Sequence, residues 1–276
     1  MAILLSTPAS CGGVVLVSLL SPPPEDILLT FLEMRRYRVI RLIIDVPATT
    51  PHALFETNDQ IHNLLVYAMG AQGYHPPAKQ TAAWGFGVIS QPVSVNGPRR
   101  LRRIQQIIVG SSHPDAANAL ARLTPGDLME PSQVPGAGLD LRTATIRPDD
   151  PWIPTDVLAA RPVSPIRVLE HRDGANGSTA LLTLGEAWES ALNRTMTRRL
   201  GRPVQLRVIP DDLYVRERQG HIVGRRAVKR DRLGRPVVLP GLEFPFILIG
   251  TPEDLRDAWV NGLGAGTGMG FGCLVI

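Results

Sequence analysis

Apolar and polar residues follow two alternating periods along the chain, the two-residue period of strands and the longer period of helices. From Tyr37 onward the predicted order is strand, helix, two strands, helix and strand, and it then recurs after a proline-rich stretch. Two β-α-β-β-α-β units in succession are typical of ferredoxin-like domains. We therefore predict an α+β fold of tandem ferredoxin-like (RRM-like) domains. The predicted strands are 37–46, 81–90, 103–110, 139–146, 164–171, 203–210, 242–250 and 271–276, and the predicted helices are 59–70 (capped by Asn58), 112–123, 185–201 and 252–261.

The proline-rich stretch PDDPWIPTDVLAARP separates the two units. We predict an N-terminal extension over residues 1–36, a first ferredoxin-like domain over 37–150, a linker over 151–163 and a second domain over 164–276. The second domain carries an arginine-rich insertion and ends in a glycine-rich loop.

Six glycines occupy every second position in the run GLGAGTGMGFG, close to the end of the sequence. A backbone without Cβ atoms adopts positive φ, lets a phosphodiester approach closely and offers N–H groups to an anion. The run has no Lys and no Ser and so lacks the Gly-Lys-Ser/Thr ending of a P-loop, and its order of helix, loop and strand is the reverse of a dinucleotide site. We therefore predict that this loop binds RNA. The glycines assigned to RNA binding are Gly262, Gly264, Gly266, Gly268 and Gly270.

The charge balance agrees with an RNA partner. The chain has 29 basic and 25 acidic residues, for a net charge of +4. Only Lys79 and Lys229 are lysine, and the other basic residues are arginine, whose planar guanidinium pairs with phosphates and stacks on bases. The codon bias of a GC-rich genome explains the same skew equally well, so composition alone does not identify the partner.

The remaining composition narrows the class of protein. Cys11 and Cys273 are too few for a disulfide framework or a zinc site. The apolar run VVLVSLL is far shorter than a membrane span, and the first residues lack the basic region of a signal peptide. We expect a cytoplasmic protein that is not membrane-bound.

Three segments carry a family resemblance: RPVSPIRVL at 161–169, FILIGTPEDLRDAWVNGLG at 246–264 and GLGAGTGMGFGCLVI at 262–276. With the tandem domains, they resemble the RAMP superfamily of CRISPR proteins and, within it, the Cas6 family that processes precursor CRISPR RNA. The resemblance spans about residues 37–276, and residues 1–36 have no counterpart. The high arginine content suggests a divergent CRISPR type, although no residue decides the subtype.

The resemblance implies a metal-independent endoribonuclease that needs no cofactor. In this family the RNA 2′-OH attacks the adjacent phosphorus, which gives a 2′,3′-cyclic phosphate and a 5′-OH. The implied partners are the repeat stem-loop of precursor CRISPR RNA, the mature crRNA, to which the enzyme stays bound, and other CRISPR effector subunits. Such a reaction needs a general base, a proton donor and cations that stabilise the developing charge.

Two histidines of the first domain are candidates for the base, which makes this domain the predicted catalytic one. His62 lies in the predicted helix 59–70, where some family members carry a catalytic His after a Tyr that Asp59 replaces here. His75 follows the helix, with Lys79 four residues on as a charge stabiliser, as in other members. A polar-face role for His62, a solvated loop at His75 and a site built from arginines without His are the competing interpretations.

Arginines cluster in the second domain. Between Arg194 and Arg235 the sequence holds 12 Arg and one Lys against four acidic residues. Some have helical spacing, and the rest lie in a segment too polar for a core, which suits an extended hairpin. In the family that the chain resembles, such elements hold the repeat stem-loop, and the resemblance implies the same role here. Clustered arginine suits this role because A-form RNA is recognised through phosphates and 2′-hydroxyls; a flexible solvated loop is the alternative. The assigned residues are Arg194, Arg198, Arg199, Arg202, Arg225, Arg226, Lys229, Arg230 and Arg232.

Smaller features leave alternatives open. The cluster PRRLRR at 98–103 either holds single-stranded RNA or marks an exposed turn.

The leading function is a crRNA-processing endoribonuclease. A non-catalytic RAMP subunit that binds crRNA is the first alternative, and an unrelated protein with duplicated ferredoxin-like domains is the second.

Overall fold

The computed structural model describes residues 39–76, 83–93, 101–130, 138–149, 154–171 and 178–276. The extension predicted over residues 1–36 lies outside the described residues, and residues 37–276 make up the larger of two units. All that follows concerns the larger unit.

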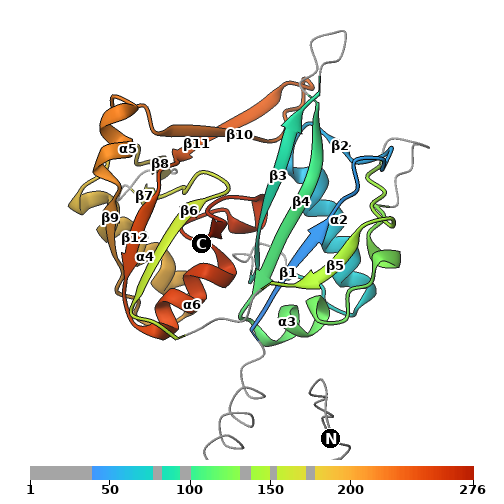
Figure 1. The fold of residues 1–276 in the computed structure, drawn as a ribbon, viewed down its shortest axis with the longest axis horizontal. Coiled ribbons are helices and arrows are strands. Elements are labelled where there is room, and N and C mark those ends of the chain that lie inside the picture. Colours follow the sequence, from blue (N-terminus) through green and yellow to red (C-terminus); the bar gives the residue numbers. More distant parts are fainter. Residues whose placement is uncertain (1–38, 77–82, 94–100, 131–137, 150–153, 172–177) are drawn as a thin grey trace, which may run out of the picture. The chain divides into compact units, whose positions relative to one another are not determined.

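The first half of this unit is built around an antiparallel sheet in the order β3-β4-β1-β5, with a short β2 that also pairs with β4 (Figure 1). Apolar side chains of its two helices pack against one face of the sheet in a single cluster. The elements are β1 (Ile40–Asp45), β2 (Leu54–Phe55), α2 (Asn58–Ala71), β3 (Gly85–Pro92), β4 (Arg102–Ser111), α3 (Pro114–Leu120), η1 (Pro125–Asp127) and β5 (Thr145–Pro148).

The second half repeats the arrangement with the order β13-β6-β12-β9. In both halves the first strand lies between the third and the fourth, which is the ferredoxin-like order, so the predicted fold is confirmed. The elements are β6 (Val157–Pro162), α4 (Glu186–Leu200), β9 (Arg207–Pro210), β12 (Phe246–Ile249), α6 (Pro252–Asn261) and β13 (Leu274–Val275).

The strand that opens the second sheet begins earlier than predicted. Residues 157–162, assigned to the linker, form β6, in which Leu158 and Ala160 are buried in the core. Prolines flank this segment and are typical of a linker, so its alternation of buried and exposed positions was not recognised as a strand. The predicted strand 164–171 instead leaves the sheet, and β7 (Leu169–His171) pairs with β8 (Ser178–Ala180) in a separate hairpin. Apart from the start of this strand, we keep the predicted domain boundaries as a proposal.

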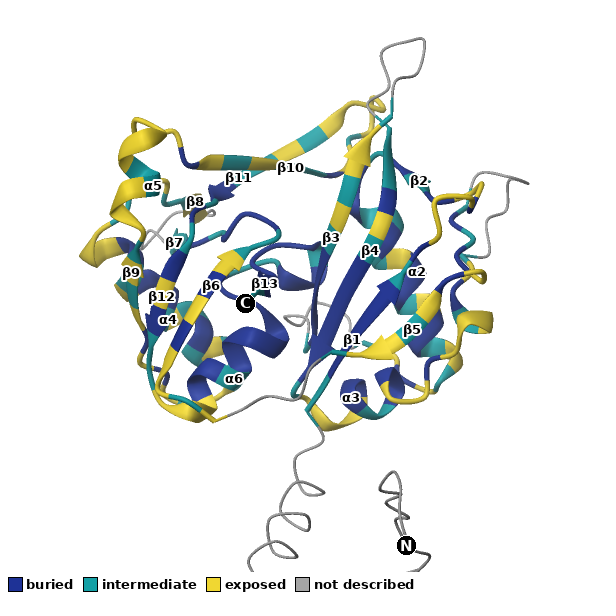
Figure 2. Cartoon of the chain, viewed as in Figure 1, coloured by how far each residue is buried: buried dark blue, intermediate teal, exposed yellow. Residues whose placement is uncertain are grey.

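The arginine-rich insertion is ordered as a short helix, α5 (Asp212–Glu217), and a hairpin of β10 (Val223–Arg230) and β11 (Pro236–Leu242). We call this hairpin, residues 223–242, the arm. It is largely exposed or only partly buried (Figure 2), as expected for a hairpin too polar to form core. Arg230 of the arm forms an ion pair with Glu56 of the first half at 2.5 Å.

The two halves are joined through buried contacts. Ile43 and Ile108 of the first sheet pack against Cys273 near the C-terminal end of the second. The buried guanidinium of Arg41 pairs with Asp149 at 2.7 Å and donates to the backbone carbonyls of Trp259 and Leu274. These contacts hold the glycine-rich segment of the second half against the first.

Candidate functional site

The N-terminal end of α2 faces the glycine-rich loop of the other half. Thr57, not the predicted Asn58, caps the helix: the backbone N–H of Thr57 donates to the Gln60 side chain at 3.2 Å, as in a capping box. Asn58 is thereby free for a different bond, and its side-chain amide donates to the carbonyl of Met269 at 2.8 Å. The helix start is thus tied to the loop.

His62 lies one turn further along α2 and is held on two sides. Its Nδ1 lies 2.6 Å from the carbonyl oxygen of Gly268. A carbonyl only accepts, so Nδ1 carries the hydrogen and Nε2 is the nitrogen left to exchange a proton with a ligand. The ring also stacks on Trp84, with centroids 5.4 Å apart and planes 14° from parallel. This orientation suits a general base acting through Nε2.

The loop that supplies this carbonyl is packed inside the protein. Gly262, Gly264, Gly268 and Gly270 are buried, and Gly266 is partly buried. A Cβ at Gly264 would lie 2.4 Å from the carbonyl oxygen of Arg167, and φ at that glycine is +79°. Close packing against the protein therefore accounts for glycine here without a ligand. The RNA-binding role predicted for these glycines stays a prediction, but its premise of an open loop is wrong.

Arg199 and Arg202 of the RNA-binding set are occupied by protein partners. Arg199 donates to Thr267 Oγ1 at 3.2 Å and to the carbonyls of Gly262 and Gly264, and burial lowers its pKa to about 10. Arg202 pairs with Asp254 and Asp257 in the first turns of α6. We therefore leave both out of the proposed RNA contacts. Helical spacing alone did not separate their inward side chains from the outward ones.

Several other assigned residues are exposed, as a solvent-facing RNA surface requires. Arg194 and Arg198 lie on the outer face of α4, where Arg194 donates to Ser190 at 2.7 Å. Lys229 and Arg232 are exposed on the arm and in its turn. The structure places these two pairs on different elements, one on α4 and the other on the arm.

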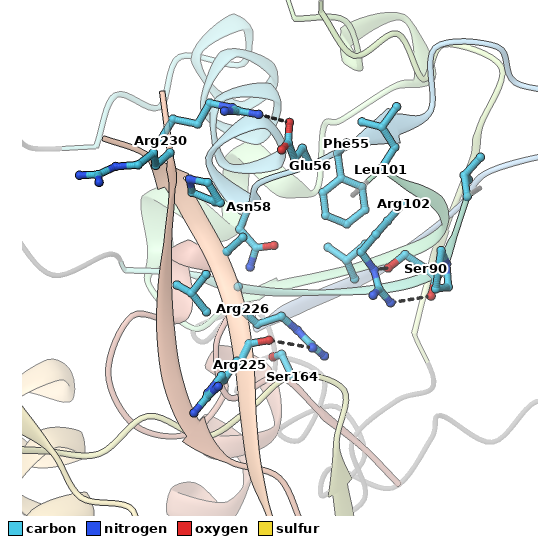
Figure 3. A pocket seen from close by; sticks show the side chains of 18 of the residues that line it. Phe55, Glu56, Asn58, Ser90, Leu101, Arg102, Ser164, Arg225, Arg226 and Arg230 are labelled. Carbon is cyan, nitrogen blue, oxygen red and sulfur yellow. Dashed lines mark hydrogen bonds and ion pairs between the residues drawn. The ribbon is translucent and has the colours of Figure 1, made fainter. Parts of the chain in front are cut away.

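A groove of about 1180 Å³ lies between the strands β3 and β4 of the first half and the arm of the second (Figure 3). Its lining includes Asn58 and Gly270, so it reaches the place where α2 meets the glycine loop. Among the residues that the structure describes, five arginines and one acidic side chain, Glu56, line it. A groove with this charge attracts a polyanion. The arginines are Arg102, Arg225, Arg226, Arg230 and Arg235.

The second candidate base lies elsewhere. His75 is exposed beyond the C-terminal end of α2, beside a separate polar cavity that Asp115 and Arg122 also line. The helix between residue 62 and its end at residue 71 is about 14 Å long at 1.5 Å per residue, so the two histidines do not share a site. Lys79, the predicted partner of His75, lies outside the described residues.

Sequence reasoning missed four contributors to this region. Asn58, four residues before His62, could have been found from helical spacing, because residues four apart share a face. Trp84 stacks on His62 through packing within the first half. Thr267 reaches this region only by the packing of the two halves: its Oγ1 lies 3.2 Å from the Trp84 carbonyl. Arg235 was left out although it stands in the same insertion.

Within the part of the chain that the structure describes, no group of three or more His, Cys, Asp or Glu is placed to hold a metal ion. The same residues include no helix long and apolar enough to cross a membrane.

Comparisons with known proteins show which family model and which folds the chain resembles. Residues 149–276 match the family model described as CRISPR associated protein Cas6, C-terminal. No curated protein matches the chain in sequence. Among solved structures, a Cas6-related protein from Pyrococcus furiosus superposes with a TM-score of 0.64 at 17% identity, over 86% of this chain and 98% of that one.

Two further solved structures give the same picture. One is described as a RAMP protein binding different RNA substrates (TM-score 0.57, 15% identity) and the other as CRISPR associated protein Cas6 (TM-score 0.53, 14% identity). Each covers 86% of this chain and 98% of its own. At these identities the likeness concerns the fold, and it agrees with the tandem ferredoxin-like arrangement.

Proposed function

We propose that this chain is an endoribonuclease that cuts precursor CRISPR RNA within the repeats. The premise is its relation to the Cas6 family, whose C-terminal model matches residues 149–276. The observation that carries the proposal is the fixed orientation of His62, one turn of α2 beyond Asn58, which lines the arginine-rich groove. Solved structures that share the fold include a RAMP protein described as binding RNA, which supports the same class of ligand.

RNA binding is assigned to the groove and the exposed arginines. The phosphate backbone would lie along the arm, held by Arg225 and by the exposed Lys229 and Arg232 at its far end. Because the groove reaches Asn58, one turn before His62, a backbone lying in it passes close to the positive N-terminal end of α2. Repeat stem-loops and mature crRNA are the proposed ligands, and other CRISPR effector subunits are proposed partners.

His62 is the proposed general base. Its Nε2 takes the proton from a 2′-OH, the oxygen attacks the adjacent phosphorus, and the bond from phosphorus to the 5′ oxygen breaks. The leaving oxygen takes up a proton, and the products are a 2′,3′-cyclic phosphate and a 5′-OH. The Gly268 carbonyl holds Nδ1–H in place throughout, so that Nε2 faces the reaction in one tautomer. The proposed mechanism uses no metal ion.

The test replaces His62 by Asn. The Asn side-chain amide can occupy the position of Nδ1 and keep the bond to Gly268, while the base at Nε2 is removed. We expect RNA affinity and thermal stability to persist, and single-turnover cleavage to fall by about 10²- to 10⁴-fold, the usual contribution of a general base. Cleavage is followed by gel, and the 3′ end is identified by its cyclic phosphate, with and without EDTA.

The comparison variant is His75→Asn, which alters the exposed histidine at the other end of α2. Loss of cleavage in His75→Asn with full activity in His62→Asn would show that the base is assigned to the wrong histidine. Tight RNA binding without cleavage by the unaltered protein would favour a non-catalytic crRNA-binding subunit. Loss of activity in EDTA would refute the metal-free mechanism.

A further inference from the structure

Two arginines face each other across the groove from the two halves of the protein. Arg102 is the first residue of β4, and Arg226 lies in β10 of the arm. Figure 3 shows both guanidinium groups extending into the space beside Ser164. The positive charge of Arg102 is close enough to act on Arg226 and lowers the pKa of its guanidinium, after the larger effect of burial.

Among the described residues, Arg102, Arg225 and Arg226 form no ion pair, which distinguishes them from Arg230 and Arg235 of the same groove. Arg230 is neutralised by Glu56, and Arg235 by Asp231 at 3.0 Å. Neither Arg102 nor Arg226 forms an ion pair with any described residue. The charge of Glu243 offsets the burial of Arg226 in part, yet the net direction of its pKa is still downward. The two arginines therefore lie close enough for their charges to interact, and neither is paired with a carboxylate at ion-pair distance among the described residues.

Both guanidinium groups are held in place by neutral oxygens. Arg102 donates from Nε to Ser90 Oγ at 2.9 Å and from Nη2 to the Ser90 carbonyl at 3.1 Å. Arg226 donates from Nη2 to the carbonyl of Val163 at 3.2 Å. These bonds orient the groups without cancelling their charge, and no hydrogen bond found among the described residues uses Arg102 Nη1. Pre-oriented guanidinium donors are the usual means of binding a phosphate.

A neutral donor completes the arrangement. Ser164 is buried, lines the same groove and accepts the backbone N–H of Cys273 through Oγ at 3.3 Å. Because that bond uses an oxygen lone pair, the hydroxyl hydrogen of Ser164 is available to a ligand in the groove. The site therefore combines hydrogen-bond donors from both halves, Arg102 from the first and Ser164 and Arg226 from the second.

We propose that Arg102 and Arg226 grip one and the same phosphate of bound RNA from opposite sides, with the Ser164 hydroxyl as a third donor. The inference rests on the proposed function, since it takes RNA as the ligand of the groove. It adds a bridge between the halves: one backbone phosphate links β4 of the first half to the arm of the second.

The test is a scan of the repeat RNA with single neutral methylphosphonate linkages. The RNA carries 2′-O-methyl groups, which remove the attacking hydroxyl, and binding is measured for the full-length protein, Arg102→Gln, Arg226→Gln and the double variant. Arg142→Gln is the matched control, because Arg142 is an exposed arginine paired with Asp140 outside the groove. Thermal unfolding of each variant checks that the substitution has not disrupted folding of the groove. Arg102→Lys and Arg226→Lys are included as milder substitutions that keep the positive charge.

We expect one linkage whose neutralisation weakens binding to the unaltered protein by about tenfold, the usual effect of losing a charged hydrogen bond. The same linkage should have a smaller effect in each single Gln variant, because the remaining arginine still contacts the phosphate, and little effect in the double variant. The loss of affinity in the double variant should be smaller than the product of the two single losses. Arg142→Gln should show the unaltered pattern. Two different sensitive linkages, one for each arginine, would overturn the shared grip while leaving RNA binding intact. Absence of RNA binding by the unaltered protein would overturn both the proposed function and the grip, and inorganic phosphate competing at millimolar concentration would instead identify a free-anion site.

Discussion

Replacing Gly264 by Ala tests whether the glycine-rich loop is glycine because of packing or because of a ligand. The new Cβ would lie 2.4 Å from the Arg167 carbonyl oxygen, closer than real contacts allow, at a φ of +79°. That carbonyl accepts the N–H of Ala265 at 2.7 Å, so the backbone cannot move away without weakening this bond. Packing therefore predicts a loss of stability that does not depend on RNA.

The expected loss can be estimated from three effects. A residue with Cβ at positive φ costs about 1–2 kcal/mol. Forcing an extra carbon into a closely packed region costs about 1–3 kcal/mol, and a weakened hydrogen bond about 1 kcal/mol. The free energy of unfolding of Gly264→Ala should thus fall by about 3–6 kcal/mol.

Gly201→Ala is the matched control for the backbone effect. Gly201 has a φ of +69° at the end of α4, and a Cβ there meets nothing within 4 Å. It should lose only about 1–2 kcal/mol. Both variants are compared with the unaltered protein by urea unfolding followed through tryptophan fluorescence and circular dichroism, and RNA affinity is measured under conditions where each is folded. If Gly264→Ala is as stable as Gly201→Ala but no longer binds RNA, the packing explanation is refuted.

Three further predictions follow from buried or paired groups. Burial raises the pKa of the Cys273 thiol, so little thiolate forms at neutral pH. Mass spectrometry after iodoacetamide treatment should find Cys273 alkylated only in denaturant, and rapid labelling of Cys273 in the native protein would contradict its packing. Arg41→Met removes the buried partner of Asp149 and should lower the free energy of unfolding by about 3–5 kcal/mol, whereas a loss below about 1 kcal/mol would show that the halves are joined without it. A double-mutant cycle of Glu56→Gln and Arg230→Gln should give a coupling energy of about 0.2–1 kcal/mol that shrinks in high salt, because the Arg230 side chain is 41% exposed; a coupling insensitive to salt would contradict this.

Local sequence patterns carried most of the secondary structure. The helix around His62 and the helix ending at Gly201 were predicted within a residue or two because apolar spacing and end residues act over a few positions. The strand β6 was missed because its prolines resemble a linker, and only pairing with β12 reveals its burial pattern. Strand pairing is a property of segments far apart in sequence, which local patterns do not encode.

For the candidate site, too, some features could be predicted from the sequence and others depend on the tertiary structure. The sequence alone supplied the tandem ferredoxin-like order, the two histidines, the arginine-rich insertion as a hairpin and the family of the C-terminal half. It could not tell Arg199, which is turned inward to the glycine loop, from Arg225, which is exposed in the groove, since both are arginines in polar surroundings. Nor could it show that Gly268 fixes His62, or that Arg102 and Arg226 line the same groove. Those arrangements join residues more than a hundred positions apart, and only the packing of one half against the other decides them.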